Sequence, residues 1–211
     1  MSFFCFMILF IDTETTGLSS KPNMHEIIQL GGLLCNNRHI IESISIKCQP
    51  TAWSKISKQA LDVTNLSIDT LKSYPEPQEM FSFFYEKIIS YKKRIKLAGQ
   101  NVKFDTRFLE KWWNMWKTTN QHNFLDVFDV EDSYELMEIT KPLKELGILL
   151  VDNVKLGTVA NALEIKPDGD LHDAMTDIRL THQTMFDLID RISWLNNSAL
   201  NNQFKKYINL K

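Results

Sequence analysis

Three apolar runs in the first 46 residues predict part of a β-sheet. The run from Phe3 to Ile11 is short and continuous, as in a strand buried on both faces, and it ends at the polar, turn-forming residues 12–17. The runs Ile27–Leu34 and His39–Ile46 flank Asn36-Asn37-Arg38, where asparagine tolerates the left-handed backbone of a tight hairpin. We therefore expect these two runs to pair as a hairpin beside the first strand.

Helical and extended patterns alternate through the middle of the chain. Residues 59–71 suit short helices, and Glu79–Ser90 suits a longer helix with one apolar face. Ile95–Ala98 alternates as a short strand and turns at Gly99-Gln100-Asn101 into another helix. The spacing of its apolar residues predicts that they pack in the core: Phe104, Phe108, Trp112 and Met115.

The last third of the chain predicts one more strand and two more helices. Phe124–Val130 is the expected fifth strand, and Lys155–Glu164 is an expected helix. A break at residues 167–170 precedes a final helix from about His172 to Ile192, with Ala174, Ile178, Met185 and Leu188 facing inward. This order predicts an α/β fold, a mixed five-stranded sheet with helices on both faces, in one domain over residues 1–194. We expect residues 195–211 to form a polar tail.

Composition narrows the class of protein. Hydrophobic residues make up 44% and charged residues 24%, which excludes a disordered chain and a membrane bundle. The run from Phe3 to Ile11 lacks the basic start and cleavage site of a signal peptide and is too short to span a bilayer. We therefore expect a cytoplasmic or other intracellular protein without a membrane partner. Cys5, Cys35 and Cys48 are odd in number and widely spaced, which predicts reduced, buried thiols.

The first candidates for chemistry are Asp12 and Glu14. Side chains two positions apart on a strand share one face, so both carboxylates point to the same place and repel each other. A bound cation relieves that repulsion, and hard oxygen ligands suit Mg²⁺ or Mn²⁺. A solvated strand end that caps a helix is the alternative for this pair taken alone.

Two more acids and a histidine are candidates to complete a site. Asp105 follows a strand-to-helix turn, where an acid also suits the helix dipole. Asp177 stands between the inward-facing Ala174 and Ile178, where a carboxylate needs a partner such as a metal. His172 lies about 140° from Asp177 on a continuous helix, so the two converge only if His172 is at the helix start or on the preceding loop. Taken singly, this and the remaining histidines suit surface or capping positions: His25, His39, His122 and His182.

Three segments carry a family resemblance. Residues 10–18 (Phe-Ile-Asp-Thr-Glu-Thr-Thr-Gly-Leu), 99–105 (Gly-Gln-Asn-Val-Lys-Phe-Asp) and 172–177 (His-Asp-Ala-Met-Thr-Asp) resemble, in order, the three motifs of the DnaQ-like, or DEDDh, exonucleases within the ribonuclease H-like fold. The resemblance runs from Phe3 to about Leu188 and departs at Asn65, where many relatives have glycine. A sister group has tyrosine where this chain has Asp173, so the histidine form is indicated.

The resemblance implies a metal-dependent 3′–5′ exonuclease. Such an enzyme hydrolyses phosphodiester bonds at the 3′ end of single-stranded nucleic acid and releases nucleoside 5′-monophosphates. It implies two ions, with Asp12 bridging both, Glu14 and Asp177 completing one, and Asp105 holding the other. His172 is the implied general base. The first motif has the form of DNA proofreading relatives and so favours DNA. An RNA-trimming enzyme and an idle module that binds nucleic acid or a polymerase are the alternatives.

Residues that contact the substrate follow from the same resemblance. It places the terminal nucleotide against Thr15, Thr16 and Leu18, with Asn101 as a further contact, although Leu18 equally suits the core. Because the net charge is −2, any contact with a polyanion must be local or carried by cations. Two sets of residues stay open between nucleic-acid contact and an ordinary structural place. They are the cations Lys92, Lys93, Arg94, Lys103 and Arg107, and the aromatic residues Trp113 and Trp116.

Overall fold

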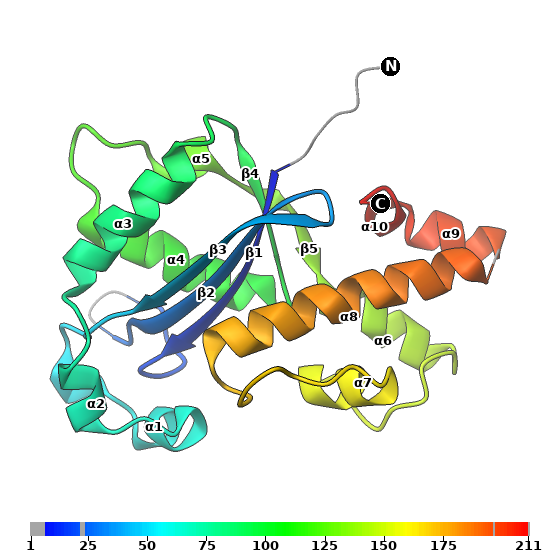
Figure 1. The fold of residues 1–211 in the computed structure, drawn as a ribbon, viewed down its shortest axis with the longest axis horizontal. Helices are drawn as coiled ribbons and strands as arrows, with labels where there is room; N and C mark the ends of the chain where they lie inside the picture. Colours follow the sequence, from blue (N-terminus) through cyan, green and yellow to red (C-terminus); the bar gives the residue numbers. More distant parts are fainter. Residues whose placement is uncertain (1–6, 22–23, 196, 211) are drawn as a thin grey trace.

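The computed structural model describes residues 7–21, 24–195 and 197–210. Over these residues five strands form one sheet in the order β3-β2-β1-β4-β5 (Figure 1). β2 pairs antiparallel with β1 and β3, whereas β4 runs parallel to β1 and β5. The strands are β1 (Met7–Thr15), β2 (Ile27–Asn36), β3 (His39–Lys47), β4 (Ile95–Gly99) and β5 (Phe128–Glu135). The predicted mixed five-stranded sheet of a ribonuclease H-like fold is confirmed.

β1 is the central strand and carries the first motif inside it. The strand continues to Thr15, so Asp12 and Glu14 extend from regular strand and not from a turn. Residues 3–6 of the predicted strand lie outside the described residues. The β2–β3 hairpin is confirmed, and Asn37 adopts a left-handed φ of +53° at its turn. Asn65 has the same φ at the end of α1 (Lys58–Thr64), which explains how asparagine replaces glycine there.

Helices cover both faces of the sheet, as predicted. On one face α3 (Pro77–Ile89) and α4 (Val102–Trp116) enclose a core with Leu9 and Ile11 of β1. On the other face α8 (Ala174–Trp194) crosses the sheet over Ile8 and Phe10 (Figure 1). α6 (Leu136–Glu145) and α7 (Leu156–Ala162) pack on this second face. Between β3 and α3 the chain forms η1 (Trp53–Lys55), α1 (Lys58–Thr64) and α2 (Ile68–Lys72).

The predicted fifth strand is displaced along the chain. Phe124–Val127 forms a helical turn, α5, because Asn123 and Asp126 build a capping box there. The strand begins only at Phe128 and continues to Glu135, past the predicted end at Val130. α6 follows at once and has no counterpart among the predicted elements.

Three aromatic residues of α4 belong to the core, whereas Phe104 and Trp116 are half-buried at its edge. Phe108 and Trp112 are buried as predicted, but Met115 is 44% exposed, so its predicted core position is wrong. Trp113 is fully buried, packs edge-on against Phe81, and donates its indole N–H to the His122 carbonyl oxygen at 2.9 Å. Trp113 is therefore a structural residue, and base stacking by it is excluded.

The expected polar tail is folded onto the domain, which corrects that prediction. α9 (Ser198–Gln203) and α10 (Lys205–Ile208) follow α8. Their apolar residues recur three or four positions apart and are buried on the α8 face of the sheet: Leu200, Phe204, Tyr207 and Leu210. The Tyr207 hydroxyl donates to the Glu135 carbonyl oxygen at 3.1 Å, so this segment also supports the end of β5.

We expect Phe204→Ala to destabilise the protein by about 3 kcal/mol, because an aromatic side chain that is 2% exposed leaves a cavity when truncated. Lys205→Ala, at an exposed neighbouring position, is the control and should have little effect. Urea unfolding of both variants measures the difference. Equal stability of the two variants would show that the segment does not contribute to the core.

Cys35 and Cys48 are buried free thiols, as predicted, whereas Cys5 lies outside the described residues. Burial raises the pKa of both thiols to about 12, which keeps them protonated and unreactive. Each helix in the described ranges is too short or too polar to cross a bilayer.

Candidate active site

The carboxyl ends of β1, β4 and β5 form one edge of the sheet, and the candidate acids gather there. β1 outreaches β4: Phe10 pairs with Ala98, so Asp12 and Glu14 extend beyond the end of the shorter strand. Even-numbered residues of β1 face α8, as Ile8 and Phe10 show, and odd-numbered residues face α4. The strand therefore presents Asp12 and Glu14 to the start of α8.

The first turn of α8 lies directly on β2. Asp173 is its N-cap, and its carboxylate accepts the backbone N–H groups of Met175 and Thr176 at 3.1 and 3.2 Å. Gly31, the residue paired with Asp12, lies beneath this turn. A Cβ atom on Gly31 would come within 2.2 Å of the Ala174 carbonyl oxygen, so only glycine allows the helix to begin so close to the sheet.

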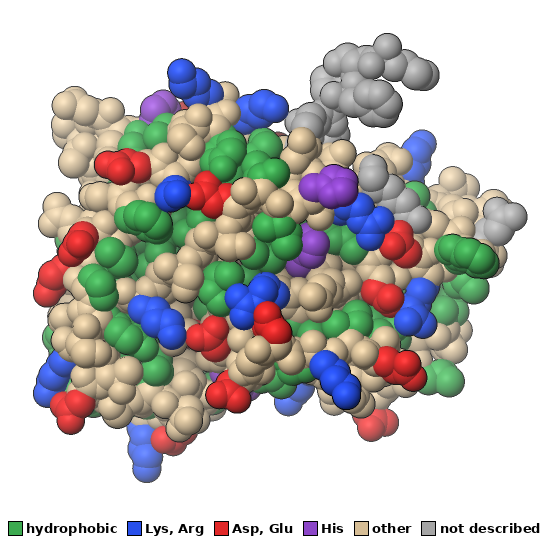
Figure 2. All heavy atoms as spheres, in the orientation of Figure 1, with side chains coloured by type: hydrophobic (Ala, Val, Ile, Leu, Met, Phe, Trp, Pro, Cys, Tyr) green, Lys and Arg blue, Asp and Glu red, His purple; other side chains and the backbone are tan. Residues whose placement is uncertain are grey.

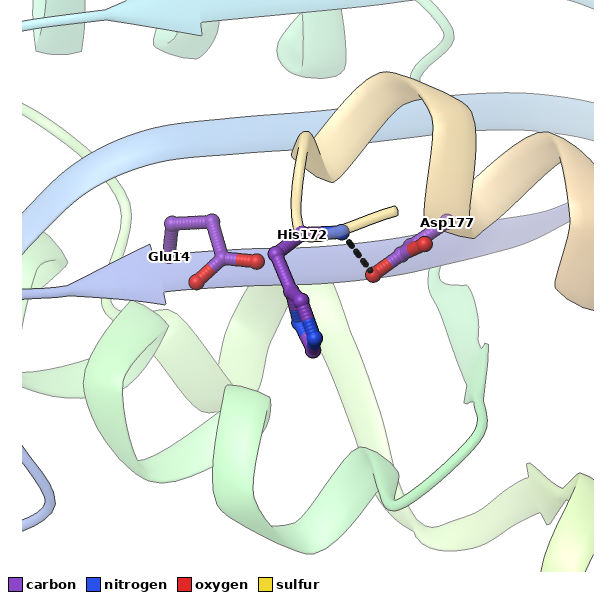
Figure 3. Close-up of side chains that lie close together, drawn as sticks. All are labelled: Glu14, His172 and Asp177. Atoms are coloured by element: carbon purple, nitrogen blue, oxygen red, sulfur yellow. Dashed lines mark hydrogen bonds between the residues drawn. The ribbon is translucent and has the colours of Figure 1, made fainter. Parts of the chain in front are cut away.

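Glu14, His172 and Asp177 converge at this point. Each offers one ligand atom, and the three atoms lie within 4.8 Å of one another. Figure 3 shows Glu14 on the strand and Asp177 on the helix, with His172 between them on the preceding loop. His172 has a left-handed φ of +68° and donates its backbone N–H to Asp177 Oδ2 at 3.1 Å (Figure 3). His172 thus meets the condition set by the sequence, a place on the loop before the helix.

The donor set suits a divalent cation. Asp177 is 9% exposed, and its Oδ1 atom has no hydrogen-bond partner among the described residues. An unpartnered buried carboxylate oxygen costs free energy that a cation recovers. Burial, followed by the charges of Asp177, Asp105 and Asp173, raises the pKa of Glu14 to about 8. Burial also raises the pKa of Asp177, and the hydrogen bond from His172 opposes this shift. Oxygen-rich, crowded carboxylates of this kind fit Mg²⁺ or Mn²⁺.

Asp12 lies in the field of the other acids but outside the three-residue group. Burial raises its pKa well above the ordinary range, and the charges of Asp105, Glu14 and Asp177 raise it further. The acids on α4, β1 and α8 are therefore close enough to Asp12 to repel its negative charge. The bridging role that the family resemblance implies for Asp12 stays a prediction.

Asp105 is turned towards β1. Its Oδ1 atom accepts the Thr13 hydroxyl at 2.7 Å and the Thr13 backbone N–H at 2.9 Å. Burial raises the pKa of Asp105 to about 7 against the effect of these hydrogen bonds. Asp105 is near Asp12 in electrostatic terms and does not belong to the group around His172. One of its oxygens is thus already engaged in the fold.

Glu135 is a buried acid that the sequence did not single out. It ends β5 opposite Gly99, is 7% exposed, and has its Oε1 atom 3.3 Å from the Lys103 ammonium group. Its charge contributes to raising the pKa of Asp105. The signal that would have revealed it is its position at the end of the fifth strand, which required the correct strand boundary.

The raised pKa values predict a pH-dependent response to cations. The ordinary pKa of Glu14 is 4.5 and its folded value is about 8, so between these values the folded state binds protons that the unfolded chain releases. This contribution to stability is fully present below about pH 4.5 and is lost as the pH rises through about 8. We expect the Tm of the cation-free protein to fall across this range, and Mg²⁺ to raise it by an increment that grows with pH.

Differential scanning fluorimetry with EDTA or Mg²⁺ from pH 5 to 8.5 measures this increment. Buffer without divalent ions and with added Na⁺ at matched ionic strength is the control, because general screening raises the Tm without a divalent ion. An increment that stays constant or shrinks as the pH rises would contradict the assignment of Glu14 and its neighbours as the cation site.

A hollow of about 190 Å³ adjoins the acids; we call it the terminal hollow. Thr15, Gly17 and Leu18 line one side, residues 57–64 another, and Phe104 of α4 a third. Leu18 is 78% exposed, so the alternative of a core position is wrong. Asn101 is also exposed and occupies the N-cap position of α4 without a capping hydrogen bond from its side chain.

Thr16 is held by the fold. Its side chain is 1% exposed, and its hydroxyl oxygen accepts the Glu26 backbone N–H at 2.9 Å. Its own backbone N–H donates to the Glu26 carbonyl oxygen, and its carbonyl oxygen accepts the Ser57 N–H at 2.8 Å. Thr16 thus ties the first motif to the segment that forms the opposite wall of the terminal hollow.

Positive charge is dispersed. On the face in Figure 2, Lys and Arg side chains are interspersed with Asp and Glu, which agrees with the net charge of −2. Lys92, Lys93 and Arg94 precede β4 and so lie at the opposite end of the strand from Gly99 and the acids. This cluster is therefore separated from the acids by the length of β4, and a contact between it and nucleic acid stays a prediction.

The comparisons with known proteins agree with this geometry. The family model described as Exonuclease, RNase T, matches residues 9–185. No curated protein matches the chain by sequence. Exonuclease I from Methylocaldum szegediense superposes with a TM-score of 0.68 at 15% identity, covering 93% of this chain and 42% of that one. E. coli exonuclease I in complex with a dT13 oligonucleotide superposes with a TM-score of 0.67 at 15% identity, covering 92% of this chain and 45% of that one. A 3′-exonuclease that recognises the histone mRNA stem-loop superposes with a TM-score of 0.62 at 14% identity, covering 89% of this chain and 83% of that one. The chain thus spans less than half the length of the exonuclease I chains.

Proposed function

The chain belongs to the exonuclease family whose model spans residues 9–185, and from that membership we propose that it is a 3′–5′ exonuclease. Its proposed substrate is single-stranded nucleic acid, DNA foremost, and its products are nucleoside 5′-monophosphates. The observation that carries the proposal is the convergence of Glu14, His172 and Asp177 within 4.8 Å, in the electrostatic field of Asp12, beside the terminal hollow.

We propose that Asp12, Glu14, Asp105 and Asp177 hold two divalent ions, Mg²⁺ or Mn²⁺. Bound ions of this kind stabilise the attacking and leaving oxygens of an in-line phosphoryl displacement. The chain supports this with buried carboxylates that repel one another and with the unpartnered Oδ1 atom of Asp177. The ions also provide the local positive field that a protein of net charge −2 otherwise lacks.

His172 is the proposed general base. Its imidazole ring is exposed, and one of its nitrogen atoms lies within 4.8 Å of oxygen atoms of Glu14 and Asp177. Its backbone is fixed by the hydrogen bond to Asp177, so the ring is held at the mouth of the site. There the imidazole takes the proton of the attacking water as the water oxygen bonds to phosphorus, and the 3′ oxygen of the preceding nucleotide leaves.

The terminal hollow is the proposed seat of the last nucleotide. Leu18 and Phe104 offer apolar surfaces to a base, and Thr15 offers its backbone near Glu14. Thr16 acts by fixing this loop through Glu26 and Ser57. Asn101, exposed at the start of α4, is proposed as a contact for the sugar-phosphate backbone. The polymerase partner and the intracellular location expected from the sequence stay predictions.

The experiment offers 5′-labelled single-stranded DNA and RNA of one sequence to the protein, with Mg²⁺ and then with EDTA. A ladder that shortens from the 3′ end, faster on DNA and abolished by EDTA, supports the proposal. If the RNA ladder shortens faster, RNA is the preferred substrate and the protein is an RNA-trimming exonuclease. The solved structure of a histone mRNA 3′-exonuclease makes this a concrete alternative. Binding without any ladder would favour an idle nucleic-acid-binding module.

A further inference from the structure

The chain enters α8 through residues 165–173, which follow α7 and which we call the histidine loop (Figure 1). Residues 166–172 of this loop, His172 included, are exposed. An exposed segment gains little from apolar burial, so its position depends on a few local contacts. The proposed general base therefore lies on a segment whose place must be set by its contacts with α8.

The first two turns of α8 supply such contacts from one face. Thr176 and Arg179 are three residues apart on the helix and so lie on the same side. A Cβ atom on Gly169 would come within 2.6 Å of the Thr176 hydroxyl oxygen, so the loop backbone lies against this face. The Arg179 Nε and Nη2 atoms donate to Oδ2 and Oδ1 of Asp168 at 2.5 and 3.0 Å. The histidine loop thus contacts α8 at two consecutive residues.

The Arg179–Asp168 ion pair restrains the loop in orientation as well as in distance. Two parallel hydrogen bonds between a planar guanidinium and a carboxylate fix the relative position of both groups. The hydrogen bond from Arg179 lowers the pKa of Asp168, which keeps this carboxylate ionised. The two side chains are 35% and 57% exposed, so the pair adds little to the stability of the whole domain. Its effect is therefore local to the loop.

His172 lies between this ion pair and a second point of attachment. It follows Asp168 by four residues, and its own backbone N–H donates to Asp177 Oδ2 at 3.1 Å. Asp177 and Arg179 are two residues apart on α8, so both ends of the segment from Asp168 to His172 are held by the same part of the helix. Release of one end leaves the segment attached only at the other.

We propose that Arg179 is a positioning residue for His172, because its ion pair with Asp168 holds the histidine loop and keeps the imidazole beside Glu14 and Asp177. This inference rests on the proposed function and adds a residue that acts through another. A general base must stay within hydrogen-bond reach of the attacking water. Each departure of the loop lowers the fraction of molecules that are competent to react. The terminal hollow is lined by other segments, so the effect falls on turnover and not on substrate binding.

The test compares Arg179→Gln, Asp168→Asn and the double variant with the wild type on a single-stranded DNA. We expect each single variant to lower kcat about fivefold, equivalent to about 1 kcal/mol, and to leave KM within about twofold. The double variant should lose no more than either single variant, because all three remove the same interaction. Hydrogen–deuterium exchange in EDTA should be about fivefold faster for the histidine loop of each variant.

Arg191→Gln is the matched control. Arg191 makes an ion pair of the same kind with Asp187, with 2.5 Å between Nε and Oδ2, near the far end of α8. Its loss removes the same charge and the same type of contact from the same helix. We therefore expect kcat and the exchange of the histidine loop to match the wild type in this variant.

Three results would overturn the proposal. A higher KM at unchanged kcat in Arg179→Gln would make Arg179 a substrate contact, and additive losses in the double variant would show that Arg179 and Asp168 act separately. Exchange of the histidine loop that is equal in Arg179→Gln and Arg191→Gln would show that the ion pair does not hold the loop. If the wild type cleaves no strand, the exonuclease proposal fails. Faster exchange in Arg179→Gln alone would then still support the restraint on the loop, and equal exchange would still overturn it.

Discussion

Asp12→Asn is expected to lower the turnover of 3′-end hydrolysis by roughly 10³-fold, because it removes the carboxylate proposed to contact both ions, which supply several kcal/mol of transition-state stabilisation. The same change should raise the Tm of the cation-free protein at pH 8. Asp12 is repelled by Asp105, Glu14 and Asp177, and its pKa is raised by burial, so a neutral amide of the same shape relieves the folded state. Loss of activity together with a gain in stability is a combination that misfolding cannot produce.

Single-turnover cleavage of a labelled strand and thermal unfolding in EDTA measure the two effects. Asp62→Asn is the control, since Asp62 is exposed on α1 near the terminal hollow and takes no part in the acidic cluster. An Asp12→Asn variant that keeps activity within threefold of wild type, or that unfolds at a lower temperature in EDTA, would remove the basis for the proposed cation site.

His172→Ala is expected to lower turnover by roughly 10² to 10⁴, the range for loss of one general base. The substitution keeps the backbone N–H that binds Asp177, so the loss reports on the imidazole. His172 has a φ of +68°, however, and alanine is strained in that conformation more than histidine, which is among the residues enriched there. His172→Asn avoids this strain because asparagine tolerates the left-handed region, and it provides no base of comparable strength.

We therefore expect the asparagine variant to match the wild type in Tm while losing activity as fully as the alanine variant. Rapid-quench measurement of the cleavage step separates this loss from slow product release. His39→Asn, at an exposed position on β3, controls for removal of a histidine. Near-normal cleavage by His172→Asn would assign the proton transfer to another group.

The sequence predicts the sheet well where the hydrophobic pattern is unambiguous. Continuous apolar runs identify β1 and β2, and Asn37 marks the hairpin turn. The pattern fails where local capping competes with extension, as at Phe124–Val127, where the capping box forms a helical turn. Polar composition conceals the packed end of the chain. There only the spacing of apolar residues, such as Leu200 and Phe204, indicates amphipathic helices.

For the candidate site, too, the sequence predicts the placement of some residues and not of others. The two-residue spacing of Asp12 and Glu14 fixes a shared face, and the break before α8 allows His172 to reach Asp177. The orientation of Asp105 was not predictable, because its hydrogen bonds to Thr13 join residues 92 positions apart. Glu135 escaped notice for a related reason, since its place depends on the register of β5 against β4.

Gly31 allows the backbone to set the distance between the two halves of the candidate site, the sheet and α8. A Cβ atom on Gly31 would meet the Ala174 carbonyl oxygen, so the main chains of β2 and of the first turn of α8 set the separation between α8 and the sheet that carries Glu14. Side-chain rotamers then make only small adjustments to a distance between Glu14 and Asp177 that the backbone already sets. We expect that a methyl group at this position, as in Gly31→Ala, would push the start of α8 away from the sheet and move His172 and Asp177 together away from Glu14.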